Sequence, residues 1–244
     1  MHIGNNKVAK LLSRLLFIIF CLLCGLVIQT FYETYKVEET KIQLSSIKEE
    51  KKEEWSVELK DINPDYSGWI NVWGTKVDYP VVLGKSNEEY LAKDFYGEKS
   101  RAGTLFYDET TDLSEIGNRI IYGHKMKDNT MFGTLDRFKD KNFFKDNGYV
   151  TLTDINGEHI YRIFAAMVVP GSAESIDFIN IQQWNNSLSK AEKEEMLQTI
   201  KKRASIYQEP FKTADDTFLF LVTCDYTHSD GRLVLVARSI STEE

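Results

Sequence analysis

One cysteine, one arginine and one histidine stand out in this 244-residue sequence because of where they lie relative to apolar runs. Cys224 follows the run 217–223, and Arg232 begins the next apolar run, 232–237. If both runs are antiparallel strands, the short loop between them brings the thiol and the guanidinium to the same end of one sheet. An arginine there could lower the pKa of the thiol or donate hydrogen bonds to a developing oxyanion. The alternative is a half-buried cysteine beside a surface arginine.

A nucleophilic thiol needs a base, and of the four histidines in the sequence only His2 lies in the part expected to be cytoplasmic. We favour His124, because it follows the strand-like run 119–122 and a glycine that lets backbone come close. An imidazole can accept and donate a proton near neutral pH. His228 is the competitor, being near Cys224 in sequence, but it lies in a polar loop where an exposed histidine without function is common. We interpret His159 as structural.

The N-terminal segment predicts the compartment. Residues 15–32 form an apolar stretch about as long as a bilayer-spanning helix, with basic residues before it and glutamates after it. This asymmetry predicts a single-pass signal anchor, with residues 1–14 in the cytoplasm and residues 33–244 outside the cell. A cleaved signal peptide is the alternative, but no small-residue cleavage site follows the stretch.

The composition excludes several classes of protein. Hydrophobic residues make up 42% of the chain, which excludes a disordered protein, and a formal charge of −7 argues against nucleic-acid binding. Three cysteines are too few for a disulfide framework, and two of them, Cys21 and Cys24, lie in the apolar stretch. Cys224 is therefore the only cysteine in the external part, where an unpaired thiol is a liability unless it has a role.

Residues 33–64 are rich in charged helix formers with scattered apolar positions. They predict a helical stalk that lifts the following domain off the membrane and is not part of its core. Residues 65–244 predict one catalytic domain of many short strands. We expect strands within 69–84 (two of them) and at 103–107, 119–122, 149–154, 159–169, 217–223 and 232–237. A mostly β fold follows, either a barrel or a sandwich with helical insertions.

Helices are expected at three places in this domain. Ser86 is predicted to cap a short helix at 87–93, and residues 132–147 predict two short helices. The clearest surface helix is 189–204, with Leu197 and Ile200 on its inner face. Asn156-Gly157 predicts a type I′ turn between two hairpin strands.

Three short motifs, in this order, resemble the signature of the sortase family. They are Ile121-Tyr122-Gly123-His124, Leu221-Val222-Thr223-Cys224 and Gly231-Arg232-Leu233-Val234. The resemblance covers about residues 65–240. Segments 68–82 and 87–95, together with a helix-containing insertion before the last two strands, resemble class B in particular. Val222 departs from the small polar residue that class B members often have there.

Sortases are membrane-anchored cysteine transpeptidases of Gram-positive bacteria, so the resemblance implies a closed sortase-type β-barrel with a Cys–His–Arg site at one rim. Cys224 matches the nucleophile, His124 the general acid/base, and Arg232 the arginine that binds substrate carbonyls or steadies the oxyanion. The implied reaction cuts an NPxTx-like sorting signal of a surface protein after its threonine. The thioacyl enzyme is then resolved by an amine of a peptidoglycan precursor (lipid II), with no metal or cofactor.

The resemblance also implies which residues contact the substrate. They are Asn87, Leu91, Tyr122, Phe178, Ile179, Thr223 and Asp225. For Leu91, Phe178 and Ile179 the alternative is core packing. Asp225 could orient a partner group, and we do not expect it to be a third catalytic member.

Three alternatives to wall anchoring stay open. A class B-like enzyme could polymerise pilins with a lysine as the amine, the chain could be a non-catalytic surface binding protein, or it could be a plain secreted cysteine peptidase. A class C pilin polymerase is not expected, because the sequence has no Asp-Pro-aromatic lid and no apolar stretch at residues 241–244.

Overall fold

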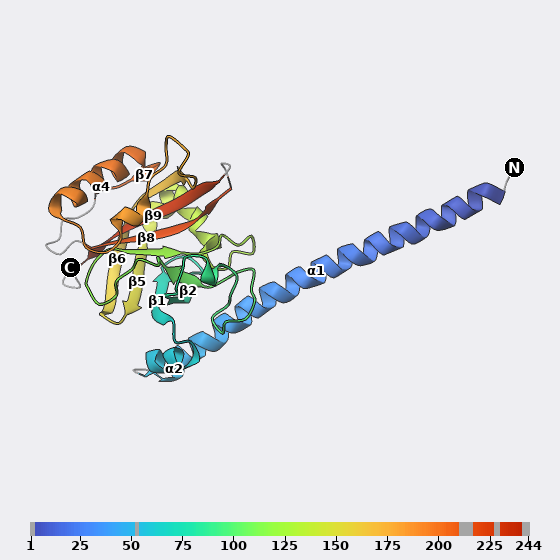
Figure 1. The fold of residues 1–244 in the computed structure, drawn as a ribbon, viewed down its shortest axis with the longest axis horizontal. Coiled ribbons are helices and arrows are strands. Elements are labelled where there is room, and N and C mark those ends of the chain that lie inside the picture. Colours follow the sequence, from blue (N-terminus) through green and yellow to red (C-terminus); the bar gives the residue numbers. More distant parts are fainter. Residues whose placement is uncertain (1–2, 52–53, 210–216, 227–229, 241–244) are drawn as a thin grey trace.

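The computed structural model describes residues 3–51, 54–209, 217–226 and 230–240, and shows a β-barrel beside one end of a long N-terminal helix (Figure 1). Eight strands close the barrel in the order β5-β1-β2-β3-β4-β8-β9-β6, and β6 pairs back with β5. The strands are β1 (Tyr66–Val72), β2 (Asp78–Val82), β3 (Leu105–Tyr107), β4 (Arg119–Tyr122), β5 (Tyr149–Asp154), β6 (Gly157–Pro170), β8 (Phe218–Asp225) and β9 (Gly231–Ile240), and a short β7 (Ile206–Tyr207) pairs with β6 outside the ring. The predicted closed β-barrel is confirmed.

The strands near Cys224 are apolar on both faces, because both faces are covered. Successive side chains of a strand point to opposite faces. Leu219 and Leu221 of β8 belong to a cluster with members from all eight barrel strands, which fills the interior. Phe220 and Val222 belong to a second cluster on the outer face. The alternation fixes which residues of β8 point outward, and Cys224 follows Val222 on that outer face.

The outer face is covered by the segment between β6 and β8. It contains η3 (Ile181–Trp184) and α4 (Lys190–Arg203), whose Ser189 and Glu192 form a capping box. The helix predicted at 189–204 is therefore confirmed. Ile200 is buried as expected, but Leu197 is only half-buried, and Met196 is the second fully buried residue of α4.

Two local expectations are wrong. The segment at 87–93 is only a short 3₁₀ turn, η1 (Glu89–Leu91), and no side chain caps it. The hairpin between β5 and β6 forms as predicted, but Asp154 pairs with Gly157, so the central turn residues are Ile155 and Asn156. Neither has the positive φ that a type I′ turn needs at both positions. The two short helices of 132–147 are present as η2 (Phe132–Lys139) and α3 (Lys141–Asp146).

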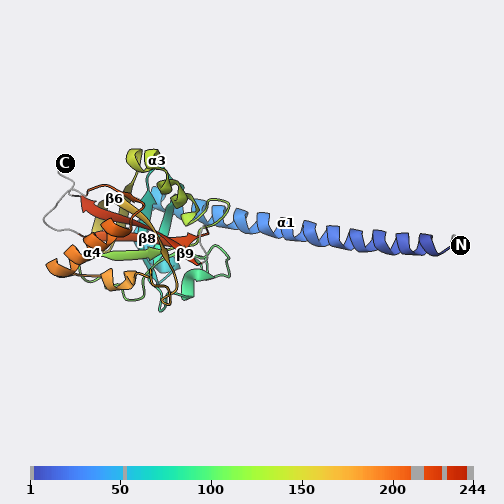
Figure 2. The same cartoon turned by 90° about the horizontal axis from the view of Figure 1, so that it is seen from above.

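The apolar stretch and the predicted stalk form one continuous helix, α1 (Ile3–Lys51), followed by α2 (Trp55–Ile62) (Figures 1 and 2). By length and composition α1 could cross a membrane once, and its apolar part is not covered by the barrel. The expectation that the stalk lies outside the core is wrong. Leu44 of α1 and Leu59 of α2 are fully buried against barrel residues that include Trp69 and Phe106. Two apolar residues among many charged ones give too weak a pattern to reveal this packing.

Candidate functional site

Cys224 and Arg232 are directly opposite each other in the β8–β9 ladder. Residues opposite each other in an antiparallel pair have Cα atoms roughly 4.5–5.5 Å apart and side chains on the same face. Cys224 is a free, half-buried thiol. The register therefore places the two side chains on the same face at the same end of the sheet, as expected from the two apolar runs.

His124 reaches the same rim through the neighbouring strand. β4 runs parallel to β8 with Tyr122 aligned to Val222, and the Gly123 N–H continues the pairing by donating to the Val222 carbonyl at 3.2 Å. His124 comes two residues after Tyr122, and Cys224 comes two residues after its aligned partner Val222. Its Nε2 lies 2.8 Å from the Leu91 carbonyl oxygen. Because a carbonyl only accepts, this hydrogen bond requires the proton on Nε2.

Four of the seven predicted substrate-contact residues lie around this rim or on the segments covering it. Leu91 contacts His124 through its carbonyl, and its side chain is 38% exposed, so core packing does not describe it. Tyr122 is half-buried and stacks on Phe106. Phe178 is partly exposed, whereas Ile179 packs against the outer-face cluster. The core-packing alternative therefore fits Ile179 best.

Thr223, Asp225 and Asn87 have different surroundings from those expected. Thr223 and Asp225 alternate with Cys224 along β8, so their side chains point to the opposite face and are 3% and 1% exposed. The buried Thr223 hydroxyl has no hydrogen-bond partner. The Asn87 side chain donates to Asp108 at 3.0 Å and accepts from the Glu109 N–H at 2.8 Å. Reasoning from the motifs alone could not show that the side chains of Asn87 and Asp225 are paired within the fold.

Asp108, which we did not identify from the sequence, joins the segments around Tyr122. This buried carboxylate accepts hydrogen bonds from the Tyr122 hydroxyl (3.0 Å) and from Gln182 of η3 (2.9 Å), besides those from Asn87 and Thr110. Burial raises the pKa of Asp108, but hydrogen bonds from Thr110, Gln182 and Asn87 outweigh it and hold the pKa below its usual value. A carboxylate two residues before a threonine is too common a pattern to reveal this role.

A chain of ion pairs connects the residue after His124 with the residue after Cys224. Lys125 pairs with Asp136 (Nζ–Oδ2 2.6 Å), Asp136 pairs with Lys139 (Oδ1–Nζ 2.7 Å), and Lys139 pairs with Asp225. Burial raises the pKa of Asp136, but the two lysines outweigh this and lower it. Because η2 carries both Asp136 and Lys139, it ties the ends of β4 and β8 together. No local sequence pattern predicts these ion pairs.

The arginine has its own neighbours. Arg232 pairs with Asp230 (Nη1–Oδ1 2.9 Å), and a Cβ at Gly171 would lie 2.8 Å from its guanidinium carbon, so a larger residue at 171 would displace the guanidinium. His159 lies on β6 with Nε2 3.6 Å from an Asp154 carboxylate oxygen. The competing His228 lies outside the described residues. Among the residues that the structure describes, no group of three or more His, Cys, Asp or Glu could hold a metal ion.

A closed barrel with a cysteine, a histidine and an arginine at one rim is the architecture of a sortase. A family model for the sortase domain matches residues 70–240, and this chain belongs to the sortase family. It is 32% identical to sortase B of Staphylococcus aureus over 187 residues, which cover 75% of this chain and 73% of that protein. Sortase B of Listeria monocytogenes is 31% identical over 189 residues, with the same coverage of each.

The solved structures that this chain resembles are also class B sortases. A mutant form of sortase B from Clostridium perfringens matches with a TM-score of 0.72 and 31% identity, over 84% of this chain and 98% of that one. A class B sortase of Streptococcus pyogenes involved in pilus biogenesis matches with a TM-score of 0.64 and 30% identity, over 75% and 97%. The chain is thus a class B-like sortase, a cysteine transpeptidase of the cell envelope.

Proposed function

We propose that Cys224, His124 and Arg232 are the catalytic residues of this transpeptidase. The observation that carries the proposal is the strand register. On one side of β8, Cys224 is opposite Arg232 of β9. On the other side, Val222 is aligned with Tyr122 of β4, and His124 comes two residues after Tyr122. Sulfur suits such a reaction because it is both a good nucleophile and a good leaving group, so one amide exchange becomes two acyl transfers.

In the first transfer, the Cys224 thiolate attacks the carbonyl carbon of the substrate threonine, and Arg232 stabilises the oxyanion that forms. Protonated His124 gives its proton to the leaving amine as the C–N bond breaks. In the second transfer, His124 takes a proton from the incoming amine, which attacks the thioester and releases the thiolate. Since Nε2 is hydrogen-bonded to the Leu91 carbonyl oxygen, Nδ1 is the nitrogen that donates the proton in the first transfer and accepts it in the second.

The substrate proposed is an NPxTx-like sorting signal of a surface protein. The acceptor proposed is an amine of a peptidoglycan precursor, which would anchor the client protein to the cell wall. A second candidate acceptor is a pilin lysine. It is supported by the similarity to the Streptococcus pyogenes class B sortase that is involved in pilus biogenesis. Leu91, Tyr122 and Phe178 are the residues whose side chains best fit contact with the signal, because they are at least partly exposed near the rim.

We propose the placement expected from the sequence for the remainder of the chain. Residues 1–14 are cytoplasmic, 15–32 span the membrane, and the catalytic domain, 65–244, lies outside the cell. The apolar part of α1 supports the membrane span, and the charge difference across it supports the orientation.

The test is cleavage of a fluorescent NPxTx-containing peptide by the full chain in detergent. Cys224→Ala and His124→Ala are expected to abolish cleavage while the circular dichroism spectrum stays unchanged. Cys21→Ser and Cys24→Ser are the matched controls, because they remove the other two thiols, and they should keep full activity. A fully active Cys224→Ala enzyme would refute the assignment.

The acceptor is tested by product analysis. The thioacyl enzyme is offered a triglycine amine, a diaminopimelate-containing peptide or a pilin-type lysine peptide, and each product is identified by mass. A transpeptidase should turn over slowly with water alone and faster with its proper amine. Equal rates with and without any amine would indicate a hydrolytic peptidase instead.

A further inference from the structure

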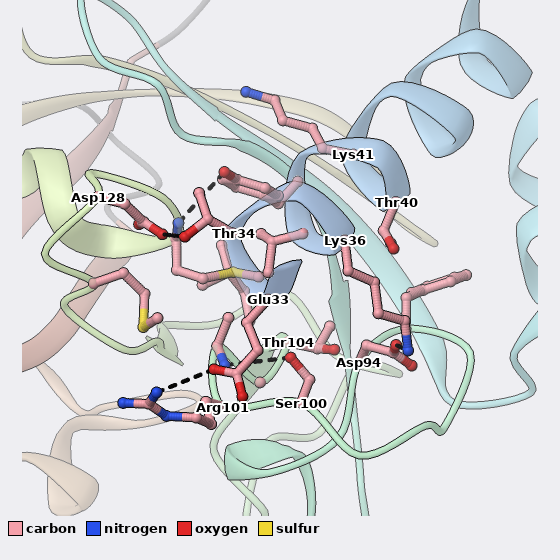
Figure 3. A pocket seen from close by; sticks show the side chains of 18 of the residues that line it. Glu33, Thr34, Lys36, Thr40, Lys41, Asp94, Ser100, Arg101, Thr104 and Asp128 are labelled. Atoms are coloured by element: carbon pink, nitrogen blue, oxygen red, sulfur yellow. Dashed lines mark hydrogen bonds and ion pairs between the residues drawn. The ribbon is translucent and has the colours of Figure 1, made fainter. Parts of the chain in front are cut away.

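A cavity of about 770 Å³ lies between α1 and the barrel (Figure 3). None of the three proposed catalytic residues lines it. One wall is α1 from Gln29 to Leu44. The facing walls come from residues within 94–105 and 125–131, with Tyr79 and Tyr226 also lining it. The second of these segments directly follows His124. Neither the family reaction nor the proposed mechanism uses this cavity.

Specific polar contacts join the walls at three places. The Thr34 hydroxyl donates to the Asp128 carboxylate at 2.8 Å, and Glu33 pairs with Arg101 at 3.1 Å. Lys36 pairs with Asp94 at 3.1 Å. Figure 3 shows these side chains reaching from α1 to the barrel loops around the cavity. These contacts hold α1 against the barrel loops at the edges of the cavity. The cavity therefore lies between two surfaces that specific contacts hold together.

The lining suits an anion that has an apolar part. Six cations and three carboxylates line the cavity, although the whole chain has a net charge of −7. The cations are Lys36, Lys41, Lys99, Arg101, Lys125 and Lys127. The Arg101 guanidinium contacts Glu33 through Nη1 and its side chain is 67% exposed, so it has further N–H donors to offer. Apolar lining residues such as Phe31, Val37 and Met131 lie beside these charges.

The position of the cavity relative to the membrane indicates which kind of molecule would carry such an anion. Gln29, Thr30 and Phe31 line one end of the cavity and belong to the segment 15–32 that we place in the bilayer. That end therefore lies at the depth of the lipid headgroups, where cationic side chains attract anionic lipids. We propose that the cavity binds the phosphate-bearing headgroup of an anionic membrane lipid. The proposal rests on the membrane placement of α1 and not on the transpeptidase chemistry.

The test is native mass spectrometry of the full chain, released from detergent containing equal amounts of phosphatidylglycerol and phosphatidylcholine. Phosphatidylglycerol should be retained at least about five-fold over phosphatidylcholine, also by Cys224→Ala, so the result is independent of catalysis. The triple variant Lys99→Gln, Arg101→Gln, Lys127→Gln should lose this preference. The matched control, Lys190→Gln, Lys201→Gln, Lys202→Gln on the remote α4, removes the same charge and should keep it.

A second variant avoids changes of charge. Thr40→Trp places bulk in the cavity and should lower phosphatidylglycerol retention as the triple variant does, with peptide cleavage unchanged. Equal retention of the two lipids by the unmodified chain, or an unchanged preference in both cavity variants, would overturn the proposal. Displacement of the lipid by millimolar glycerol phosphate would overturn it in favour of a site for a soluble phosphate. Failure of displacement supports the lipid.

Discussion

Cys224 and His124 are held at the rim in different ways. Cys224 lies inside a strand, and its ladder with β9 continues past it to Asp225 and Gly231. His124 lies beyond the end of β4 and is held by single contacts, among them the Leu91 carbonyl and the N–H of Phe132. The backbone thus fixes the position of the thiol, whereas a few contacts from other segments fix the imidazole. Substitutions of neighbouring side chains should therefore disturb the histidine more than the cysteine.

His124→Ala should have the largest effect. Loss of the general acid/base lowers peptide cleavage by about 10³-fold or more, since such groups contribute 10²–10⁴-fold. Alkylation of Cys224 at pH 10, which is above the ordinary pKa of a free cysteine, should keep its rate, because the β8–β9 ladder positions the residue. The measurement uses a Cys21→Ser, Cys24→Ser background. A changed alkylation rate at pH 10 would mean that the two sides of the rim are not independent.

Arg232→Gln should come next, with a loss of about 10²-fold in kcat for peptide cleavage, because one strong oxyanion donor is removed. Arg232→Lys should retain only part of the activity, since an ammonium cannot reproduce the two parallel hydrogen bonds of a guanidinium. Steady-state kinetics at saturating peptide measures both. Wild-type kcat in Arg232→Gln would exclude the arginine from the reaction.

Asp108→Asn should act on the histidine side through Tyr122 and η3. Hydrogen bonds to a charged group are each worth roughly 1.5–3 kcal/mol, so we expect a loss of about 2 kcal/mol in the free energy of unfolding. Because the pKa of Asp108 is lowered in the folded state, its stabilisation is complete above the ordinary aspartate pKa of about 4 and is lost as the pH falls through the lowered value.

Urea unfolding from pH 3 to pH 7 measures this effect. The difference between the wild type and Asp108→Asn should be constant above about pH 5 and shrink below about pH 4. Asp146→Asn, at an exposed position of α3, is the control and should change little at any pH. A difference that grows toward acid pH would contradict the expected direction.

Asp136→Asn should have the smallest effect of the four. It removes the central carboxylate between Lys125 and Lys139 and leaves the pair of Lys139 with Asp225 in place. We expect kcat to fall by about three- to ten-fold with KM unchanged, because His124 loses a constraint on its position. The stability should fall by only about 0.5–1 kcal/mol, as for other partly exposed ion pairs.

Glu209→Gln is the matched control for this variant, because it breaks the exposed pair of Glu209 with Lys201, remote from the rim. It should leave kcat unchanged. An equal loss of kcat in both variants would show that the ion-pair chain has no particular role in positioning His124.

The sequence predicts the strands around the rim well, because their signals are local. The apolar runs that end at Tyr122, Cys224 and Asp154 are each bounded by polar or glycine residues, and the strands end within one or two residues of those positions. The juxtaposition of Cys224 with Arg232 follows from one short connection between two antiparallel strands. Such contacts depend on few residues and on rules that hold in most sheets.

Long-range contacts between polar groups could not be predicted in this way. The link from Lys139 to Asp225 joins residues 86 positions apart, and Asp108 meets Gln182 across 74. Leu44 packs on the barrel although its own segment resembles a solvated helix. In each case the partner is chosen by the closed barrel, whose shape depends on all eight strands at once.

If residues 15–32 span the bilayer as we propose, the unbroken helix α1 connects them rigidly to the barrel. From Ile3 to Lys51 it is about 74 Å long at 1.5 Å per residue, and it passes from the apolar segment to the barrel without an interruption in the helix. A tilt of such a membrane segment would therefore swing the barrel with it, because Leu44 of the same helix packs on barrel residues. If the bilayer thickens or thins, the tilt changes to match, and the height at which the thiol meets its clients changes with it.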